Sequence, residues 1–257
     1  MISNRFLLCM AAATLAAPGR GVAAQAFPGT LPPAASLVAK HGIAVGGEAL
    51  LKAASITTKG GMSMPGAGIN ATFEMVQQAP NRMKMVSTIA GMGQLQVGFD
   101  GTTGWAIDPM QGPRLLAGKE FEQMRDEAAP RAQLRAPELF SAVETVADTT
   151  MGAEQCYLVK LIWKSGRETF DCFSKATGLL VGSRSVQQTV MGAIPVTILY
   201  SDYKKFGDVM VATRTVNEVM GQQQVLTVTS VELGTVPGAV ITAPPEIQAL
   251  AKPKSQD

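Results

Sequence analysis

GMGQLQVGFDGTTGWAIDPMQGPRLLAGKE, residues 91–120, holds the clearest structural pattern in the chain. Leu95, Val97 and Phe99 alternate with glutamine or glycine, which is typical of a strand with one apolar face. Asp100-Gly101 supplies a turn that tolerates positive φ, so an antiparallel partner is expected to return from it. Trp105 is predicted to lie on the apolar side of that returning strand.

The same stretch also predicts where this hairpin ends. Asp108-Pro109 and Gly112-Pro113 are expected to close it, because proline cannot donate a hydrogen bond to a sheet ladder. The charged residues that follow, 118–129, are predicted to be helical. A hairpin with one apolar face that leads into a helix indicates a curved sheet with a further element laid across its apolar face.

Composition places the chain among globular proteins with a full hydrophobic core. Of 257 residues, 46% are hydrophobic and 16% are charged, so one domain or at most two small ones is expected. Aromatic residues make up only 5%, whereas there are 14 methionines. Methionine is flexible and polarisable, so these residues are either core filler or the lining of a soft ligand site.

The N-terminal residues 1–26 are interpreted as a secretory signal peptide. Arg5 precedes an apolar run over residues 6–17, and small residues up to Ala24 or Ala26 fit a cleavage site. The run is too short to span a bilayer, and no later run approaches about 18 apolar residues, so a soluble periplasmic protein is expected. A proline-rich extended lead, residues 27–33, precedes a single domain over 34–250 and a polar tail over 251–257.

Net charge argues against partners that are held by bulk electrostatics. Removal of residues 1–26 takes away Arg5 and Arg20, so the 22 basic residues become 20, against 20 acidic residues. The processed chain would be close to neutral. A nucleic-acid partner is therefore not expected.

The rest of the chain is dominated by short strands that are bounded by turn signals. Helices are predicted over residues 34–41, 48–54 and 132–143 and after Pro244. Antiparallel strands without intervening helices indicate a meander. A sheet of about eleven strands must curl, so the predicted fold is mainly β (α+β), an incomplete antiparallel β-barrel with helices covering its open apolar face. Besides the hairpin above, strands are predicted over residues 56–64, 69–78, 82–88, 144–147, 157–163, 168–174, 179–190, 194–203, 209–218 and 222–233.

No residue pattern in the sequence supports catalysis. His41 is the only histidine, so neither a zinc site nor a Ser-His-acid triad finds its usual partners. Gly91-Met92-Gly93 lies between strands and does not open a helix, so it does not resemble a phosphate-binding loop. A non-enzymatic binding protein without metal or cofactor is predicted, and His41→Ala would leave its activity intact.

Cys156 and Cys172 flank a predicted hairpin in an oxidising compartment, where a disulfide can form. A two-residue turn at Ser165-Gly166 would place Cys156 opposite Lys175, on the other face from Cys172. A five-residue loop over 162–166 would make the two cysteines direct partners, as a disulfide needs. Both a bridge and two buried free thiols remain open at this point.

Several segments together resemble the LolA-type outer-membrane lipoprotein-sorting proteins. The similarity extends over residues 37–233 and is a pattern of strands and turns with an FDG-x-x-GW hairpin. The resemblance implies an incomplete antiparallel barrel with helices as a lid over an apolar cavity, which in the best-known members carries lipoprotein acyl chains. The segments are PGAGI (65–69), APNRMKMV (79–86), GQLQVGFDGTTGWAIDPMQGPRLLAGKE (93–120), TGLLVG (177–182) and SDYKKFGDVMVATR (201–214).

The leading hypothesis is a periplasmic carrier for a lipid or the acyl chains of a lipoprotein. Membrane-bound donor and acceptor proteins would be its partners, and a monomer is expected. The alternative is an interaction module that senses or scaffolds at the envelope without a ligand. Predicted wall residues are Phe73, Met75, Met83, Met85, Leu95, Val97, Phe99, Trp105, Tyr157, Val159, Leu161 and Trp163, each of which could instead be a sealed core position.

Overall fold

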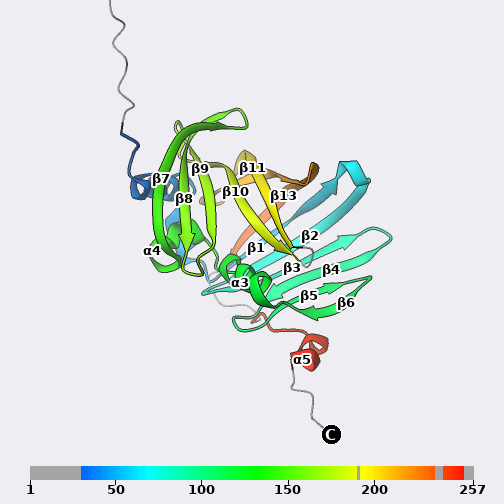
Figure 1. Ribbon diagram of the computed structural model, residues 1–257. Coiled ribbons are helices and arrows are strands. Elements are labelled where there is room, and N and C mark those ends of the chain that lie inside the picture. Colours follow the sequence, from blue (N-terminus) through cyan, green and yellow to red (C-terminus); the bar gives the residue numbers. More distant parts are fainter. Residues whose placement is uncertain (1–29, 190–191, 235–239, 252–257) are drawn as a thin grey trace, which may run out of the picture. The chain divides into compact units, whose positions relative to one another are not determined.

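The computed structural model describes residues 30–189, 192–234 and 240–251, and the described residues from Leu31 on form one compact unit (Figure 1). The predicted signal peptide and its cleavage site lie outside the described residues. So do residues 27–29 of the predicted lead and residues 252–257 of the predicted tail.

A single antiparallel sheet makes up most of this unit, with the strand order β6-β5-β4-β3-β2-β1-β13-β12-β11-β10-β9-β8-β7. The order is linear and the two end strands do not pair, so the sheet is an open, incomplete barrel as predicted, with thirteen strands instead of about eleven. The strands are β1 (Ser55–Met64), β2 (Ile69–Gln78), β3 (Arg82–Ile89), β4 (Gly93–Phe99), β5 (Gly104–Asp108), β6 (Gly112–Leu115), β7 (Phe140–Met151), β8 (Glu154–Trp163), β9 (Glu168–Ser174), β10 (Leu180–Thr189), β11 (Gly192–Phe206), β12 (Val209–Val219) and β13 (Gln222–Gly234).

Helices interrupt the meander at its start, its middle and its end. Short 3-10 turns, η1 (Pro65–Ala67) and η2 (Ala132–Arg135), lie in the β1–β2 connection and before α4. The prediction of helices near the N-terminus, after residue 118 and after Pro244 is confirmed. The helices are α1 (Ala34–Ala44), α2 (Gly47–Lys52), α3 (Gly118–Glu127), α4 (Ala136–Leu139) and α5 (Pro245–Ala251).

Two parts of the secondary structure differ from the prediction. Residues 132–143 were expected to be one helix, but the helix ends at Leu139 and β7 begins at Phe140. The alternation of exposed and half-buried residues in β7 has the period of a strand, and pairing with β8 overrides the local helical preference. Gly112-Pro113 was expected to end the hairpin, yet Gly112–Leu115 adds the edge strand β6. Proline is tolerated there because one side of an edge strand needs no donor.

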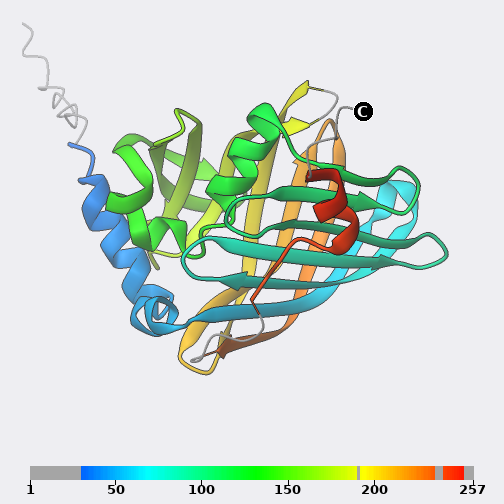
Figure 2. The same ribbon diagram turned by 90° about the horizontal axis from the view of Figure 1, so that it is seen from below.

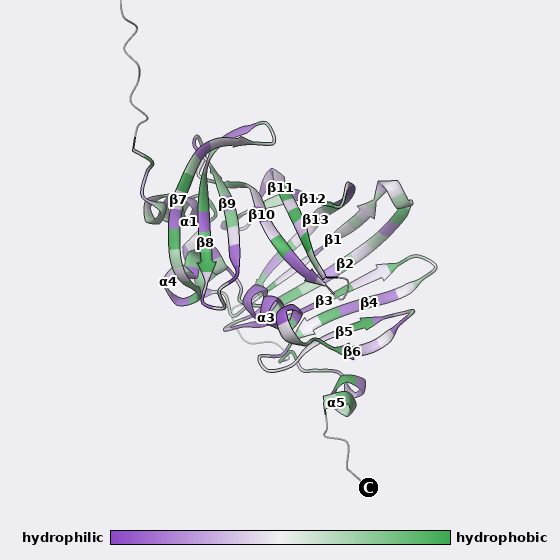
Figure 3. Cartoon of the chain, in the orientation of Figure 1, coloured by the Kyte–Doolittle hydropathy of each residue, from purple (hydrophilic) through white to green (hydrophobic). Residues whose placement is uncertain are grey.

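The sheet has two different faces, because successive side chains along a strand point in opposite directions. The alternation is visible along several strands in Figure 3. We call inner the face that carries Phe99 and Val159, and outer the face that carries Trp105 and Cys156. Helices α1 and α3 pack on the inner face, against the clusters around Val159 and Phe99, respectively. Helix α5 packs on the outer face against Trp105, as Figure 2 shows beside β3–β6.

The inner face is continuous from one half of the sheet to the other. Ala71, Met62, Leu226, Thr215 and Tyr200 are direct register partners from β2 to β11. Tyr200 in turn packs against the cluster on β8 and β9.

None of the helices within the described ranges is long and apolar enough to cross a membrane.

Candidate functional site

The predicted wall residues on β2, β3 and β4 come together on the inner face. Met75 lies opposite Met85, and Met85 lies opposite Val97, so three strands contribute one apolar row. These three side chains and Leu95 are only half-buried. We call these four residues, Met75, Met85, Leu95 and Val97, the open wall. Phe73, Met83 and Phe99 share this face and are buried beside the open wall.

The predicted wall residues on β8 behave differently. Tyr157, Val159, Leu161 and Trp163 also share the inner face, but α1 covers them with Ala34 and Leu37. Val159 is 0% exposed and Leu161 is 1% exposed. Val159, Leu161 and Trp163 therefore belong to a sealed core, which was the alternative interpretation for these positions, whereas Tyr157 packs at its margin and stays half-buried.

Trp105 does not belong to the inner face, which corrects the prediction. Asp100 Oδ1 accepts the backbone N–H groups of Thr102 and Thr103 at 3.0 and 2.8 Å, and this four-residue turn pairs Phe99 with Gly104. Trp105 then lies opposite Gly98, on the outer face. A Cβ on Gly98 would lie 2.3 Å from the Trp105 ring, so the indole occupies the space that the glycine leaves.

Helix α3 covers one end of the open wall. Phe121, Met124 and Ala128 lie at helical spacing and pack on Met83 and Phe99, with the Phe121 and Phe99 ring centroids 5.8 Å apart. This apolar contact attaches the helix to the β1–β6 half of the sheet.

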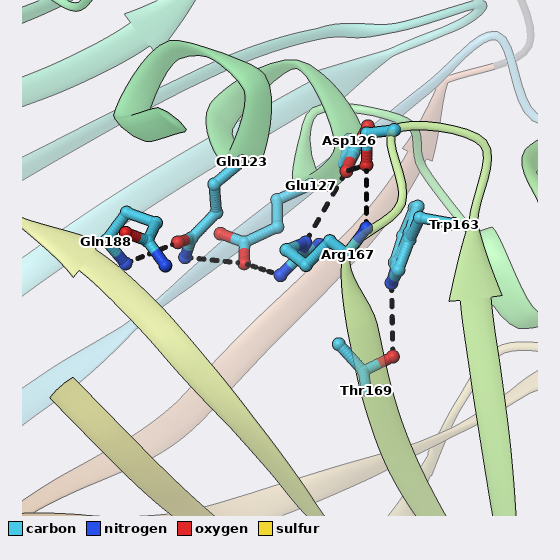
Figure 4. A network of polar contacts seen from close by, with 8 residues as sticks. Gln123, Asp126, Glu127, Trp163, Arg167, Thr169 and Gln188 are labelled. Carbon is cyan, nitrogen blue, oxygen red and sulfur yellow. Dashed lines mark hydrogen bonds and ion pairs between the residues drawn. The ribbon is translucent and has the colours of Figure 1, made fainter. Parts of the chain in front are cut away.

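Polar contacts attach the other side of α3 to β8, β9 and β10 (Figure 4). Arg167, in the turn between β8 and β9, contacts Asp126 Oδ2 at 3.4 Å and Glu127 Oε1 at 3.0 Å. Gln123 Oε1 accepts the backbone N–H of Gln188 at 2.7 Å. The Arg167 guanidinium also lies 4.7 Å from the centroid of the Trp163 ring, which orients it. We call these contacts the α3 bracket; they join the two halves across the inner face.

The sequence analysis did not identify the α3 bracket. Arg167 and Asp126 are 41 residues apart in the sequence, and their pairing depends on where the β8–β9 turn meets α3. Ser165 Oγ donates to the same carboxylate at 2.6 Å. No spacing rule in the sequence brings these residues together, and only the turn residues Ser165-Gly166 gave a signal.

Two buried titratable groups lie at the sealed core. Asp171 is 3% exposed and accepts from Ser183 Oγ at 2.6 Å and from Gln133 Nε2 at 3.0 Å. Burial raises the pKa of its carboxyl group above the ordinary value. His41 is 8% exposed, with Nδ1 3.1 Å from the carbonyl oxygen of Gly178 and its ring 5.1 Å from that of Phe173. Burial lowers the pKa of His41.

The disulfide exists, in a register that neither expected turn would produce. Cys156 lies opposite Ser174 and Leu158 lies opposite Cys172, so the bridge runs diagonally between β8 and β9. The two Cα atoms are 5.5 Å apart, within the range that a disulfide spans. The prediction that these cysteines can join is confirmed, and both expected registers were wrong.

A separate groove of about 910 Å³ lies between α1 and α2. Val38, Ile43, Leu51 and Leu134 give it an apolar lining. Within residues 30–189, 192–234 and 240–251, no three His, Cys, Asp or Glu side chains are grouped as metal ligands.

Comparisons with known proteins identify the fold. No protein-family profile matches the sequence, and no curated protein matches it. A LolA superfamily protein from Nitrosomonas europaea superposes with a TM-score of 0.57 at 15% identity, over 83% of this chain and 99% of that one. A DUF1329 family protein from Desulfovibrio piger gives 0.53 at 11% identity, over 79% and 94%. An outer membrane lipoprotein-sorting protein domain from Vibrio parahaemolyticus gives 0.50 at 10%, over 75% and 92%. The chain therefore has the fold of the LolA-like superfamily, in agreement with the resemblance seen in its sequence.

Proposed function

We propose that the protein is a non-enzymatic periplasmic carrier for an apolar ligand, a lipid or the acyl chains of a lipoprotein. The observation that carries this proposal is the open wall. It is a methionine-rich row on the inner face that stays half-buried, whereas the same face is sealed on β8 and β9.

The chemistry of the open wall suits acyl chains. Burial of an acyl chain contributes about 0.8 kcal/mol per CH₂ group, so a long chain needs no array of polar contacts. Methionine adapts to irregular apolar shapes because it is unbranched and polarisable. Met75 and Met85, which face each other across two strands, would fit chains of different length and saturation.

Helix α3 covers one end of the open wall, and the α3 bracket holds it there, so release of a ligand would require these contacts to open. Arg167 is largely buried beside Asp126, but Glu127 is 45% exposed, so solvent reaches part of the ion pair. Detachment of the polar side of α3 would leave the largely buried Arg167 and Asp126 unpaired, so opening is costly and is expected at a donor or acceptor rather than in free solution. Membrane-bound donor and acceptor proteins are the expected partners, and the lipoprotein-sorting description of the Vibrio parahaemolyticus domain supports that expectation.

A tryptophan placed in the open wall tests the site. Met85→Trp should lose uptake of a fluorescent fatty acid and keep its melting temperature, because the added volume fills ligand space. Val159→Trp, in the sealed core, should lose stability by about 1–3 kcal/mol through overpacking. Ile43→Trp is the control for the α1–α2 groove and should retain uptake. Loss of uptake in Ile43→Trp alone would place the ligand in that groove and contradict the proposal.

The cargo class can be measured directly. Native mass spectrometry with lipid extraction of protein purified from a periplasm should show a lipid or acylated peptide that disappears on delipidation. A ligand-free mass, combined with no uptake of the fluorescent fatty acid, would refute the carrier and leave the interaction module.

A further inference from the structure

The antiparallel order brings four neighbouring hairpin turns without charged residues to one end of the sheet, which the β8–β9 turn with Lys164 and Arg167 shares farther along. They connect β1 to β2, β3 to β4, β5 to β6 and β12 to β13. Three of these turns carry a methionine with a solvent-exposed side chain: Met92 is 47% exposed, Met110 is 81% exposed and Met220 is 77% exposed. We call these three residues the methionine rim.

The turns themselves are formed by other residues. Asp108 Oδ1 accepts the backbone N–H groups of Met110 and Gln111 at 2.7 and 3.0 Å, which fixes the β5–β6 turn. Gly91 and Gly93, on either side of Met92, have φ angles of 76° and 106° and supply the left-handed conformation of the β3–β4 turn. Turn geometry therefore does not require methionine at either position.

Turn geometry is unfavourable to the third methionine. Met220-Gly221 is a two-residue turn between the paired residues Val219 and Gln222, and Met220 has a φ of 50°. Asn, Asp or Gly is strongly preferred in that conformation, because a Cβ crowds the following carbonyl oxygen. Met220 is also mostly exposed, so packing within the chain does not compensate for the strain. A contact outside the chain would explain the choice of an apolar side chain here.

The surroundings of the rim favour a lipid surface over a protein partner. The four turns contain no Lys, Arg, Asp or Glu over residues 65–68, 90–92, 109–111 and 220–221. Neighbouring strands are about 4.8 Å apart, so the three methionines are separate points spread over roughly 30 Å along the curved edge of the sheet. A rigid protein would need a matched pocket for each point. A fluid bilayer interface surrounds separate apolar side chains without such matching.

We propose that this end of the sheet docks on a phospholipid bilayer through the methionine rim, with its side chains in the interfacial region. Binding then depends on apolar insertion, and no anionic headgroup is required. The proposal goes beyond the carrier function, because it concerns the surface that meets the membrane and not the cargo. Either can fail while the other holds.

Vesicle flotation tests the docking. The full chain should bind vesicles of zwitterionic phosphatidylcholine and phosphatidylethanolamine, with little change between 50 and 500 mM salt. The variant Met92→Gln/Met110→Gln/Met220→Asn should bind about tenfold or more weakly, because three apolar side chains are lost from the interface. Ile43→Gln, 85% exposed in α1 and not part of the rim, is the matched control and should bind as the wild type does.

The triple variant should change membrane binding without changing the fold. Asn suits the left-handed position 220, so the triple variant should fold with an unchanged or higher melting temperature, and its fatty-acid uptake should persist. Equal flotation of the triple variant and wild type would overturn the proposal. Wild-type flotation that needs anionic lipid and disappears in high salt would overturn it as well, as would no flotation at all.

Discussion

The two halves of the inner face have the same backbone architecture and different covers. On β8 and β9, α1 seals Val159, Leu161 and Phe173, all of which are at most 1% exposed. On β3 and β4, α3 packs at one end only, and Met85 and Val97 stay half-buried. The disulfide also lies in the sealed half, on its outer face.

Under the proposed carrier function, this difference would place stability in one half and ligand binding in the other. A sealed, cross-linked core can hold the curvature of the sheet, so the opposite half can leave apolar surface half-exposed for a ligand. The α3 bracket connects the two, because Arg167 comes from the β8–β9 turn, whereas Phe121 packs on β4. A change in the sealed half should therefore reduce stability, and a change in the open wall should affect binding.

The largest expected effect comes from truncation of the sealed core. Leu161→Ala should lower the free energy of unfolding by about 2–5 kcal/mol, because the side chain is 1% exposed and leaves a cavity. Met85→Ala, the matched truncation in the open wall, should cost about 1 kcal/mol or less, because a half-buried side chain loses less buried area. Urea unfolding measures both. Equal losses would show that the open wall is core and would remove the contrast between the halves.

Much of the fold could be predicted from alternation and turn residues. Asp100-Gly101 and the 94–99 alternation correctly predicted the hairpin. Even spacing predicted which wall residues share a face within each strand, but only the strand register shows that Met75, Met85 and Val97 lie on one face. The placement of Trp105 was wrong, because it depends on how many residues the turn contains. A shift of one residue moves a side chain to the other face.

Contacts between distant segments could not be predicted from local patterns. The 132–143 segment has a helical composition, but its second part pairs with β8 as a strand. The same limit applies to the site: the sequence identified apolar side chains on β2–β4 and β8 alike. Only the position of α1 distinguishes the sealed residues from the open wall.

Removal of the disulfide should have the second largest effect. Cys156→Ala/Cys172→Ala should lower the free energy of unfolding by about 2–3 kcal/mol, since the bridge closes a loop of 16 residues. Fatty-acid uptake should persist, because the bridge is on the outer face of the sealed half. Wild-type protein under reducing conditions is the control and should match the double variant. Loss of uptake without loss of stability would contradict the division between the two halves.

The smallest expected effect is a pH dependence that separates His41 from Asp171 within the sealed half. Burial lowers the pKa of His41 in the folded chain, so the unfolded chain binds the proton first as pH falls. The stability that goes with a neutral, buried His41 is fully present above the ordinary histidine pKa. It is lost as pH falls from that value toward the lowered pKa of the folded chain.

Asp171 acts in the opposite direction. Its pKa is raised in the folded chain, so the unfolded chain ionises first as pH rises, and stability is lost between the ordinary aspartate pKa and the folded one. The melting temperature measured from pH 4 to 8 reports the contributions of both His41 and Asp171. His41→Gln should unfold with less loss of stability on the acid side than wild type, and Asp171→Asn with less loss as pH rises from 4. A wild-type profile that neither variant changes would mean that these groups titrate alike in the folded and unfolded chain. The sealed core would then admit water, and the open wall would no longer be distinguished by its solvent access.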